Sequence, residues 1–122
     1  GIGDAIPWRR ALDQGCDRVL VVLTHPRSYV RRPDKILPLV RRTYRDYPNF
    51  IASMEERVER YNEDHRLLFQ MEREGRLKVI APTSTLGVSR TERNTEKLRL
   101  LWAQGYQMAV DRMEELRSYF GA

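Results

Sequence analysis

The hydrophobic pattern of this chain is organised around one short run, Arg18–Thr24, which contains five consecutive apolar residues, three of them β-branched. Such a run is typical of a strand that is buried on both faces in the interior of a parallel sheet. One other segment, Arg76–Ala81, predicts a strand, with Leu77, Val79 and Ile80 as its apolar residues. An open sheet commonly has about four to six strands. The pattern therefore predicts either a mostly helical chain with a small sheet, or further strands outside these residues.

Helices account for most of the other apolar residues, which recur at helical spacing. Four are predicted: short helices over Pro7–Gln14 and from Ile36 to Tyr44, a long helix over Pro48–Glu74, and a last helix from Asn94 or Thr95 to Phe120. The apolar stripe of the last helix, which includes Trp102, is expected to be buried, and Gly105 within it suggests close approach of a neighbouring element. The alternation of helices and strands predicts an α/β fold, with two parallel strands and long amphipathic helices in a single unit.

The composition is that of a globular chain. Its 122 residues favour one domain, with 41% apolar and 32% charged residues and no apolar run long enough to cross a membrane. Cys16 is the single cysteine, so no internal disulfide can form, which favours a reducing, cytoplasmic compartment. Its thiol is expected to be small and buried.

The net charge of +5 is concentrated between Arg27 and Asp46, a stretch that contains seven basic and two acidic residues. This stretch could bind the phosphates of nucleic acid, an anionic lipid surface at the membrane, or an acidic partner. A solvated helix face is the simpler interpretation. The candidate contacts are five arginines: Arg27, Arg31, Arg32, Arg41 and Arg42.

Motifs for metal, nucleotide and serine-hydrolase chemistry do not occur within the sequence. One cysteine and two histidines cannot supply a closed zinc site, and there is no P-loop, dinucleotide-binding glycine motif or nucleophile elbow. Neither metal nor cofactor is therefore expected. His25 follows the first predicted strand, where α/β enzymes place functional groups, but a structural or solvated histidine is the simpler interpretation. His65 is expected to pack at the edge of the core.

The opening segment, Gly1-Ile2-Gly3-Asp4-Ala5-Ile6-Pro7, resembles the segment that follows the catalytic aspartate in bacterial patatin-like phospholipases. Gly1 would match the third residue of that family's Asp-Gly-(Gly/Ala) motif, Asp4 its Asn/Asp position, and Pro7 the proline that starts the next helix. Later segments are similar to the family in the same order: Val19–Pro26, Tyr61–Glu63, Ile80–Pro82, Leu86–Arg90 and Gly105-Tyr106. Ala81 departs from the arginine expected before Pro82, which puts an anion contact there in doubt.

The resemblance implies an enzyme that hydrolyses lipid acyl esters through a Ser-Asp dyad. The serine, the oxyanion loop and the aspartate would all precede Gly1, so the chain would hold the C-terminal portion of a three-layer fold and no catalytic residue. Its partners would be the N-terminal half of that fold and a lipid or ester substrate. Gly1, Asp4 and Pro7 would support the motif.

Two other classes of protein fit the residues. A binding module could use the basic stretch on nucleic acid, anionic lipid or an acidic partner, and its binding would depend steeply on salt. A structural domain could self-associate through the exposed edges that two strands would leave.

Overall fold

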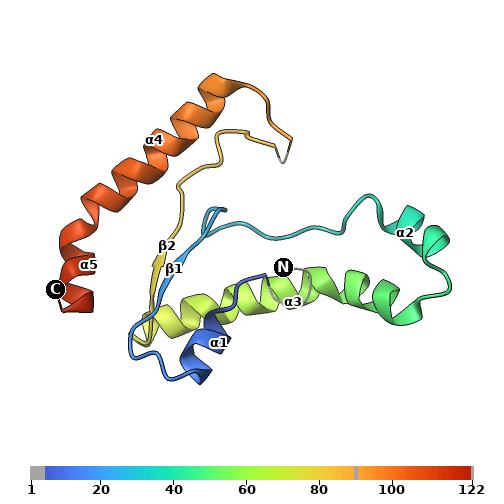
Figure 1. Cartoon of the computed structure of the whole chain (residues 1–122), viewed down its shortest axis with the longest axis horizontal. Coiled ribbons are helices and arrows are strands. Elements are labelled where there is room, and N and C mark those ends of the chain that lie inside the picture. The colour runs from blue at the N-terminus through green and yellow to red at the C-terminus, as the bar shows by residue number, and fades with distance from the viewer. Residues whose placement is uncertain (1–4, 90, 122) are drawn as a thin grey trace.

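The computed structural model describes residues 5–89 and 91–121, and Figure 1 shows an α/β arrangement with a small sheet among helices. The elements, in chain order, are α1 (Trp8–Asp13), β1 (Leu20–Val22), α2 (Leu37–Thr43), α3 (Pro48–Arg73), β2 (Lys78–Ile80), α4 (Thr95–Asp111) and α5 (Met113–Phe120). The predicted order of elements is confirmed, and the strands are shorter than the runs that predicted them. Gly1 and Asp4 lie outside the described residues, as does Arg90.

The two strands pair in parallel, as predicted, with Val21 opposite Val79 in the register. The connection between them runs through α2 and the long helix α3, which is the crossover that a parallel pair requires. Backbone bonds join Leu23 N–H to the Ile80 carbonyl at 2.8 Å and Lys78 N–H to the Val19 carbonyl at 2.9 Å. These bonds join the segment that follows α1 to the segment that follows α3.

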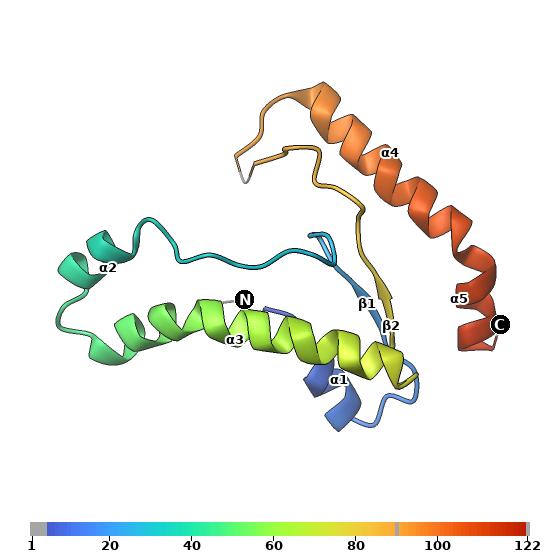
Figure 2. The ribbon, with the colours of Figure 1, turned by 180° about the vertical axis from the view of Figure 1, so that it is seen from behind.

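One face of the sheet is covered by α1 and α3. The side chains that alternate onto this face pack with Trp8 of α1 and Leu68 of α3, and three of the core residues are almost fully buried: Leu68, Leu77 and Val79. Figure 2 shows α1 and the C-terminal part of α3 together beside the sheet. This face is the hydrophobic core, and His65 lies buried in it at 6% exposure, as expected.

The other face of the sheet is only partly covered, so the prediction of a strand buried on both faces is wrong for the described chain. Val22 is 67% exposed, whereas its neighbours Val21 and Leu23 are buried. Cover on this face comes from α5, where Leu116 is buried and the Tyr119 hydroxyl accepts a bond from Val19 N–H at 3.2 Å. The run of valines suits a two-sided environment, and the described residues fill one side of it.

The predicted last helix is two helices, because α4 ends at Asp111 and α5 begins at Met113. Asn94 caps α4 as expected, with its side chain accepting bonds from the N–H groups of Glu96 and Lys97. The predicted burial of its apolar stripe is wrong: α4 contains no buried residue, and Trp102 is 70% exposed. A side chain at Gly105 would meet nothing within 4 Å, so the expected close approach is wrong as well.

The long helix α3 is amphipathic, as predicted. Glu55, Glu56, Glu59 and Glu63 are exposed, and His65 and Leu68 are buried on its apolar side. Gly75 ends it with φ +75°, a left-handed conformation that favours glycine. Within residues 5–89 and 91–121, every helix is too short or too polar to cross a membrane.

Candidate functional site

The outer edge of β2 is closed by side chains from three other segments. Val79 N–H donates to Glu72 Oε1 at 3.2 Å, and the Val79 carbonyl accepts from Arg112 Nη1 at 2.7 Å and from Arg27 Nη2 at 3.2 Å. In a parallel ladder alternate residues turn their backbone groups to opposite edges, and Val79 is the residue of β2 that faces away from β1. Its donor and its acceptor are both satisfied, so no further strand is needed there.

These side chains form a wider network that we call the β2 edge network: Arg27, Glu72, Lys78, Arg112 and Glu115. Arg27 binds the Glu72 carboxylate through two bonds, at 2.5 and 2.8 Å, and Lys78 and Arg112 both bind Glu115. The bond from Arg27 lowers the pKa of the Glu72 carboxyl. Bonds from Arg112 and Lys78 lower the pKa of the Glu115 carboxyl to about 2. Both carboxylates therefore stay ionised at lower pH than an ordinary glutamate does.

The outer edge of β1 has no such closure. Leu20 and Val22 turn their backbone groups away from β2, because Val19 and Leu23 make the bonds toward it. Within the described residues, the sheet has two strands and no side chain bonds those outward groups. A cleft of about 510 Å³ runs beside this edge.

We call this space the β1 cleft, and most of its wall is apolar. Its lining comprises Ala5, Ile6, Pro7, Trp8, Ala11, Val19, Leu20, Val21, Val22, Leu23, Thr24, His25, Arg31 and Tyr61. The polar groups gather where β1 ends and the following loop begins, together with one residue of α3. Groups that can donate a hydrogen bond dominate this polar end, and none of the lining residues that the structure describes is acidic.

Aromatic rings support the polar end of the β1 cleft. The His25 ring stacks on Tyr29 with centroids 3.9 Å apart, Tyr29 meets the edge of Tyr61, and Tyr61 stacks on His65. Burial and the nearby Arg31 lower the pKa of His25. Burial, then the neighbouring His25, lowers the pKa of His65. Both imidazoles are therefore biased toward the neutral form.

Arg31 is fixed in place by the helix below it. Its N–H donates to Asn62 Oδ1 at 2.8 Å, its carbonyl accepts from Asn62 Nδ2 at 3.0 Å, and its guanidinium lies 5.4 Å from the centre of the Tyr61 ring. These two bonds hold the loop to α3 at the level of the cleft. Within the described residues, no carboxylate lies within 4.0 Å of the Arg31 guanidinium.

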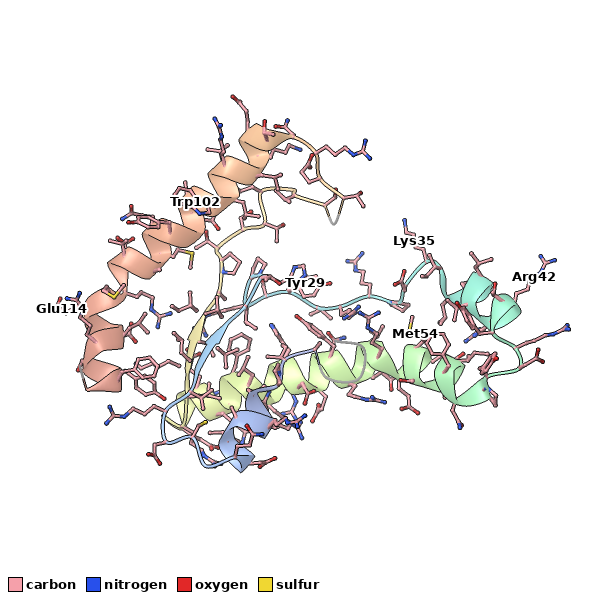
Figure 3. All side chains as sticks on the ribbon, in the orientation of Figure 1. Tyr29, Lys35, Arg42, Met54, Trp102 and Glu114 are labelled. Carbon is pink, nitrogen blue, oxygen red and sulfur yellow. The ribbon has the colours of Figure 1, made fainter. Side chains whose placement is uncertain are left out.

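The five predicted arginines do not form one site. Arg27 is paired with Glu72 in the β2 edge network, and Arg41 is paired with Glu55 of α3 at 2.7 Å. Arg32 and Arg42 are exposed. Figure 3 shows Arg42 on α2, far from Tyr29 along the long axis of the molecule. Only Arg31 lines the β1 cleft. That the five arginines contact an anion or a lipid headgroup stays a prediction.

Pro7 lies at the start of α1 and lines the β1 cleft, whereas Gly1 and Asp4, the other two motif-supporting residues, lie outside the described residues. Cys16 is exposed, so the expected buried thiol is wrong. It follows Gly15, whose φ of +84° turns the chain outward after α1. Over residues 5–89 and 91–121, no three of the His, Cys, Asp and Glu side chains form a group that could hold a metal ion.

Sequence reasoning missed Asn62, Glu72 and Arg112 as determinants of the sheet edge and the loop. Asn62 and Glu72 lie on α3 and Arg112 lies in the turn between α4 and α5, and each contacts a segment at least seven residues away, so periodicity alone gave no sign of them. The sequence offered one sign of the role of Glu72: it follows Met71, near the end of the apolar stripe of α3.

A second, smaller groove of about 270 Å³ separates the open face of the sheet from α4. Val22 and Ile80 of the sheet and Leu101, Gly105 and Met108 of α4 contribute to its walls. The groove is apolar, with Gln104 as its polar side chain from α4. The groove shows that α4 packs only partly against the sheet.

Comparison with known protein families shows that residues 47–121 match a family described as a domain of unknown function (DUF6363). The match covers more than half of the chain. The chain belongs to the DUF6363 family. The DUF6363 region holds α3, β2, α4 and α5, while β1 and the loop that carries His25 and Arg31 precede it. No curated protein and no solved structure matches the chain.

Proposed function

We propose that this chain is the C-terminal portion of a patatin-like lipid acyl hydrolase whose catalytic serine and aspartate lie outside these 122 residues. In this proposal the chain contributes strands, covering helices and one wall of the active-site region, and it is inactive alone. The remaining strands come from the N-terminal part of the same fold. The substrate is a lipid acyl ester.

The difference between the two edges of the sheet carries this proposal. The β2 edge network satisfies the outward groups of Val79, as natural proteins do at a terminal strand. The outward groups of Leu20 and Val22 have no partner within the described residues. An apolar, unprotected strand edge presents unpaired backbone groups that favour pairing with another strand. The proposal supplies that strand.

The position of the opening segment also supports the proposal. Ala5, Ile6 and Pro7 line the β1 cleft together with the end of β1. By the resemblance, the catalytic aspartate stands two positions before Gly1, a few residues along the chain from Ala5. The carboxyl ends of parallel strands are where α/β proteins bind their ligands. An aspartate delivered by this segment would act near that end.

The uncovered apolar side chains of α4 are explained by the same missing partner. Leu98, Trp102 and Tyr106 are all more than 40% exposed, which is unusual for a helix with a regular apolar stripe. A larger fold would cover them. The patatin-like assignment therefore explains the open strand edge and the open helix face with one interaction.

Two measurements test the proposal. The residue encoded two positions before Gly1 should be aspartate. Hydrolysis of a p-nitrophenyl acyl ester should be absent for the 122-residue chain, and should appear when the chain is produced joined to the segment encoded before it. Replacing the upstream nucleophilic serine with alanine should abolish that hydrolysis, while the joined protein keeps its folded circular dichroism spectrum.

Other results would contradict the proposal. Turnover by the 122-residue chain that is lost on replacing one of its own serines would place the nucleophile within it. A residue other than aspartate two positions before Gly1 would remove the motif on which the resemblance depends.

A further inference from the structure

The loop that follows β1 contacts α3 through a row of adjoining rings. In the loop, His25 stacks on Tyr29 with ring centroids 3.9 Å apart, and Tyr29 meets the edge of Tyr61 of α3 at 6.0 Å. Tyr61 stacks in turn on His65, one helical turn further along α3, at 5.7 Å. We call these four residues the ring row. It has a histidine at each end, one in the loop and one in the core.

The inner end of the ring row cannot hold a charge without a large cost. His65 is buried, and its Nε2 atom has no hydrogen-bond partner within the described residues. Its next neighbour along α3 is Phe69, whose ring lies nearly perpendicular to it with centroids 4.8 Å apart. A buried cation without a partner strongly destabilises a fold. Burial therefore lowers the pKa of His65, and repulsion from His25 lowers it further.

Positive charge also lies beside the outer half of the ring row. The Arg31 guanidinium is 5.4 Å from the centre of the Tyr61 ring. Burial lowers the pKa of His25, and repulsion from Arg31 lowers it further. Burial raises the pKa of Tyr61, so its phenol remains neutral. Two ion pairs adjoin the row: Arg27, which lies over the Phe69 ring, with Glu72, and Arg9 of α1 with Asp64, the residue before His65.

From this arrangement we infer that the ring row is a pH-dependent latch: residues 24–31 are held on α3 while His25 and His65 are neutral, and protonation of the two rings releases them. The other attachment of the loop is Asn62, whose side chain bonds the N–H and the carbonyl of Arg31. Release would break these two bonds and open the polar end of the β1 cleft, because the loop supplies part of its lining. The inference goes beyond the proposed function and needs no catalytic residue.

The direction of the pH dependence follows from the state of the two rings. When the loop is released, water reaches both imidazoles and their pKa values return toward the ordinary 6.5, whereas in the held state they are lower. The released state therefore binds more protons just below pH 6.5. The latch is complete above pH 6.5 and is lost as the pH falls through the lower pKa values of the held state. This loss begins well above the range in which the carboxylates of the β2 edge network titrate.

The experiment is NMR of the 122-residue chain between about pH 7.5 and about pH 5, where histidines titrate. The heteronuclear NOE of the Arg31 amide measures whether the loop is held, because this amide bonds Asn62 only in the held state. We expect it to fall to the value of a mobile loop, in step with protonation of both imidazoles. The Lys78 amide, which bonds the Val19 carbonyl in the sheet, is the internal control and should stay ordered.

Variants at the two histidines separate the latch from a general effect of acid. His25→Phe combined with His65→Phe keeps both rings and removes both protons, so the Arg31 amide should stay ordered at about pH 5. His25→Phe alone changes a partly buried loop position and leaves the core intact, and it should give a shallower transition, because one proton is then bound instead of two.

Three results would overturn the inference. The first is an Arg31 amide that stays ordered at about pH 5 in the unmodified chain. The second is a titration midpoint of either imidazole above 6.5, because the proton would then stabilise the held state. The third is a transition in His25→Phe with the midpoint and steepness of the unmodified chain. This single variant decides the matter even if His65→Phe fails to fold by circular dichroism.

Discussion

The two edges of the small sheet are treated in opposite ways. At β2, three side chains from the loop after β1, from α3 and from the turn between α4 and α5 bond the outward groups of Val79. At β1, the outward groups of Leu20 and Val22 face an apolar cleft. Both strands have three residues and share one ladder, so the difference does not come from the strands themselves.

The difference indicates which of the two strands is a terminal strand of the sheet. Closing an edge requires charged side chains placed at defined positions by distant segments, and this chain provides them at one edge only within its described residues. A strand whose edge is apolar and open is suited to pairing. We therefore interpret β2 as a terminal strand and β1 as an interior strand of a larger sheet, and the following predictions test that interpretation.

Proline at the last residue of β1, Val22, and at the residue after it, Leu23, gives the largest expected contrast. Leu23→Pro removes the N–H that bonds the Ile80 carbonyl and a buried side chain, so the free energy of unfolding should fall by about 3 kcal/mol or more. Val22→Pro removes an N–H that faces away from β2 and a side chain that is 67% exposed. It should cost clearly less in the isolated chain. Urea unfolding followed by circular dichroism measures both.

The same two variants distinguish the loss of pairing with a neighbouring strand from a general destabilisation of the fold. In the protein joined to its upstream segment, Val22→Pro should reduce esterase activity strongly, because the outward N–H is then needed for a neighbouring strand. If Val22→Pro retained full activity in the joined protein, β1 would not be an interior strand. Equal destabilisation of the isolated chain by both variants would contradict the assignment of inward and outward groups.

Removing the acceptor at the closed edge should have the next largest effect. Glu72→Ala leaves the Val79 N–H without its bond and Arg27 without its carboxylate, and the expected loss is about 1–3 kcal/mol in the free energy of unfolding. Glu63→Ala is the matched control on the same helix, because Glu63 pairs with the exposed Arg66 and touches no strand. It should leave the unfolding midpoint nearly unchanged. Equal effects of the two variants would show that the β2 edge network does not stabilise the strand.

Acid should weaken the closed edge in a defined range of pH. The folded state lowers the pKa of the Glu72 and Glu115 carboxyls below 4.5, and that of Glu115 to about 2. The unfolded chain restores the ordinary value, so the contribution of these pairs is complete above about pH 4.5 and is lost as the pH falls toward 2.

Glu115→Gln tests this range directly. Because the Glu115 side chain is 41% exposed, solvent screens its pairs, and the variant should lose about 0.5–1 kcal/mol at neutral pH and show a shallower loss of stability in acid. Glu114→Gln changes a neighbouring residue of α5, labelled in Figure 3, that forms no ion pair within the described residues, and it should keep the full acid dependence. Denaturation midpoints measured across this pH range compare the three proteins. A parallel acid response in all three would exclude Glu115 as a contributor.

Much of the fold could be predicted from local pattern. The apolar runs identified both strands, helical spacing identified α1 to α4, and Gly75 and Asn94 marked a helix end and a helix start that the structure confirms. These signals act within a few residues, which is why one sequence suffices. Burial was predicted less well, because whether Val22 or Trp102 is covered depends on what packs against it and not on its own sequence neighbourhood.

The candidate site was less accessible to sequence reasoning. A run of like charge does not show which arginines already have partners, and the pairing of Arg27 with Glu72 spans 45 residues. The fixed position of Arg31 depends on Asn62, 31 residues further along the chain. His25 was identified by its place after a strand, but its stack on Tyr29 needs a turn that brings the two rings together.

The smallest expected effect concerns the open side of the molecule at α4. Trp102 is 70% exposed and Tyr106 stacks beside it, so Trp102→Ser should change the free energy of unfolding of the isolated chain by no more than about 0.5 kcal/mol. Leu116→Ala, at a buried position of α5, is the comparison and should cost about 2–5 kcal/mol. In the protein joined to its upstream segment, Trp102→Ser should become destabilising, because a covered tryptophan contributes apolar burial that an exposed one does not. If urea unfolding gave the same small change in both proteins, α4 would remain uncovered in the complete fold, and the open helix face would need an explanation other than the one that accounts for the open edge of β1.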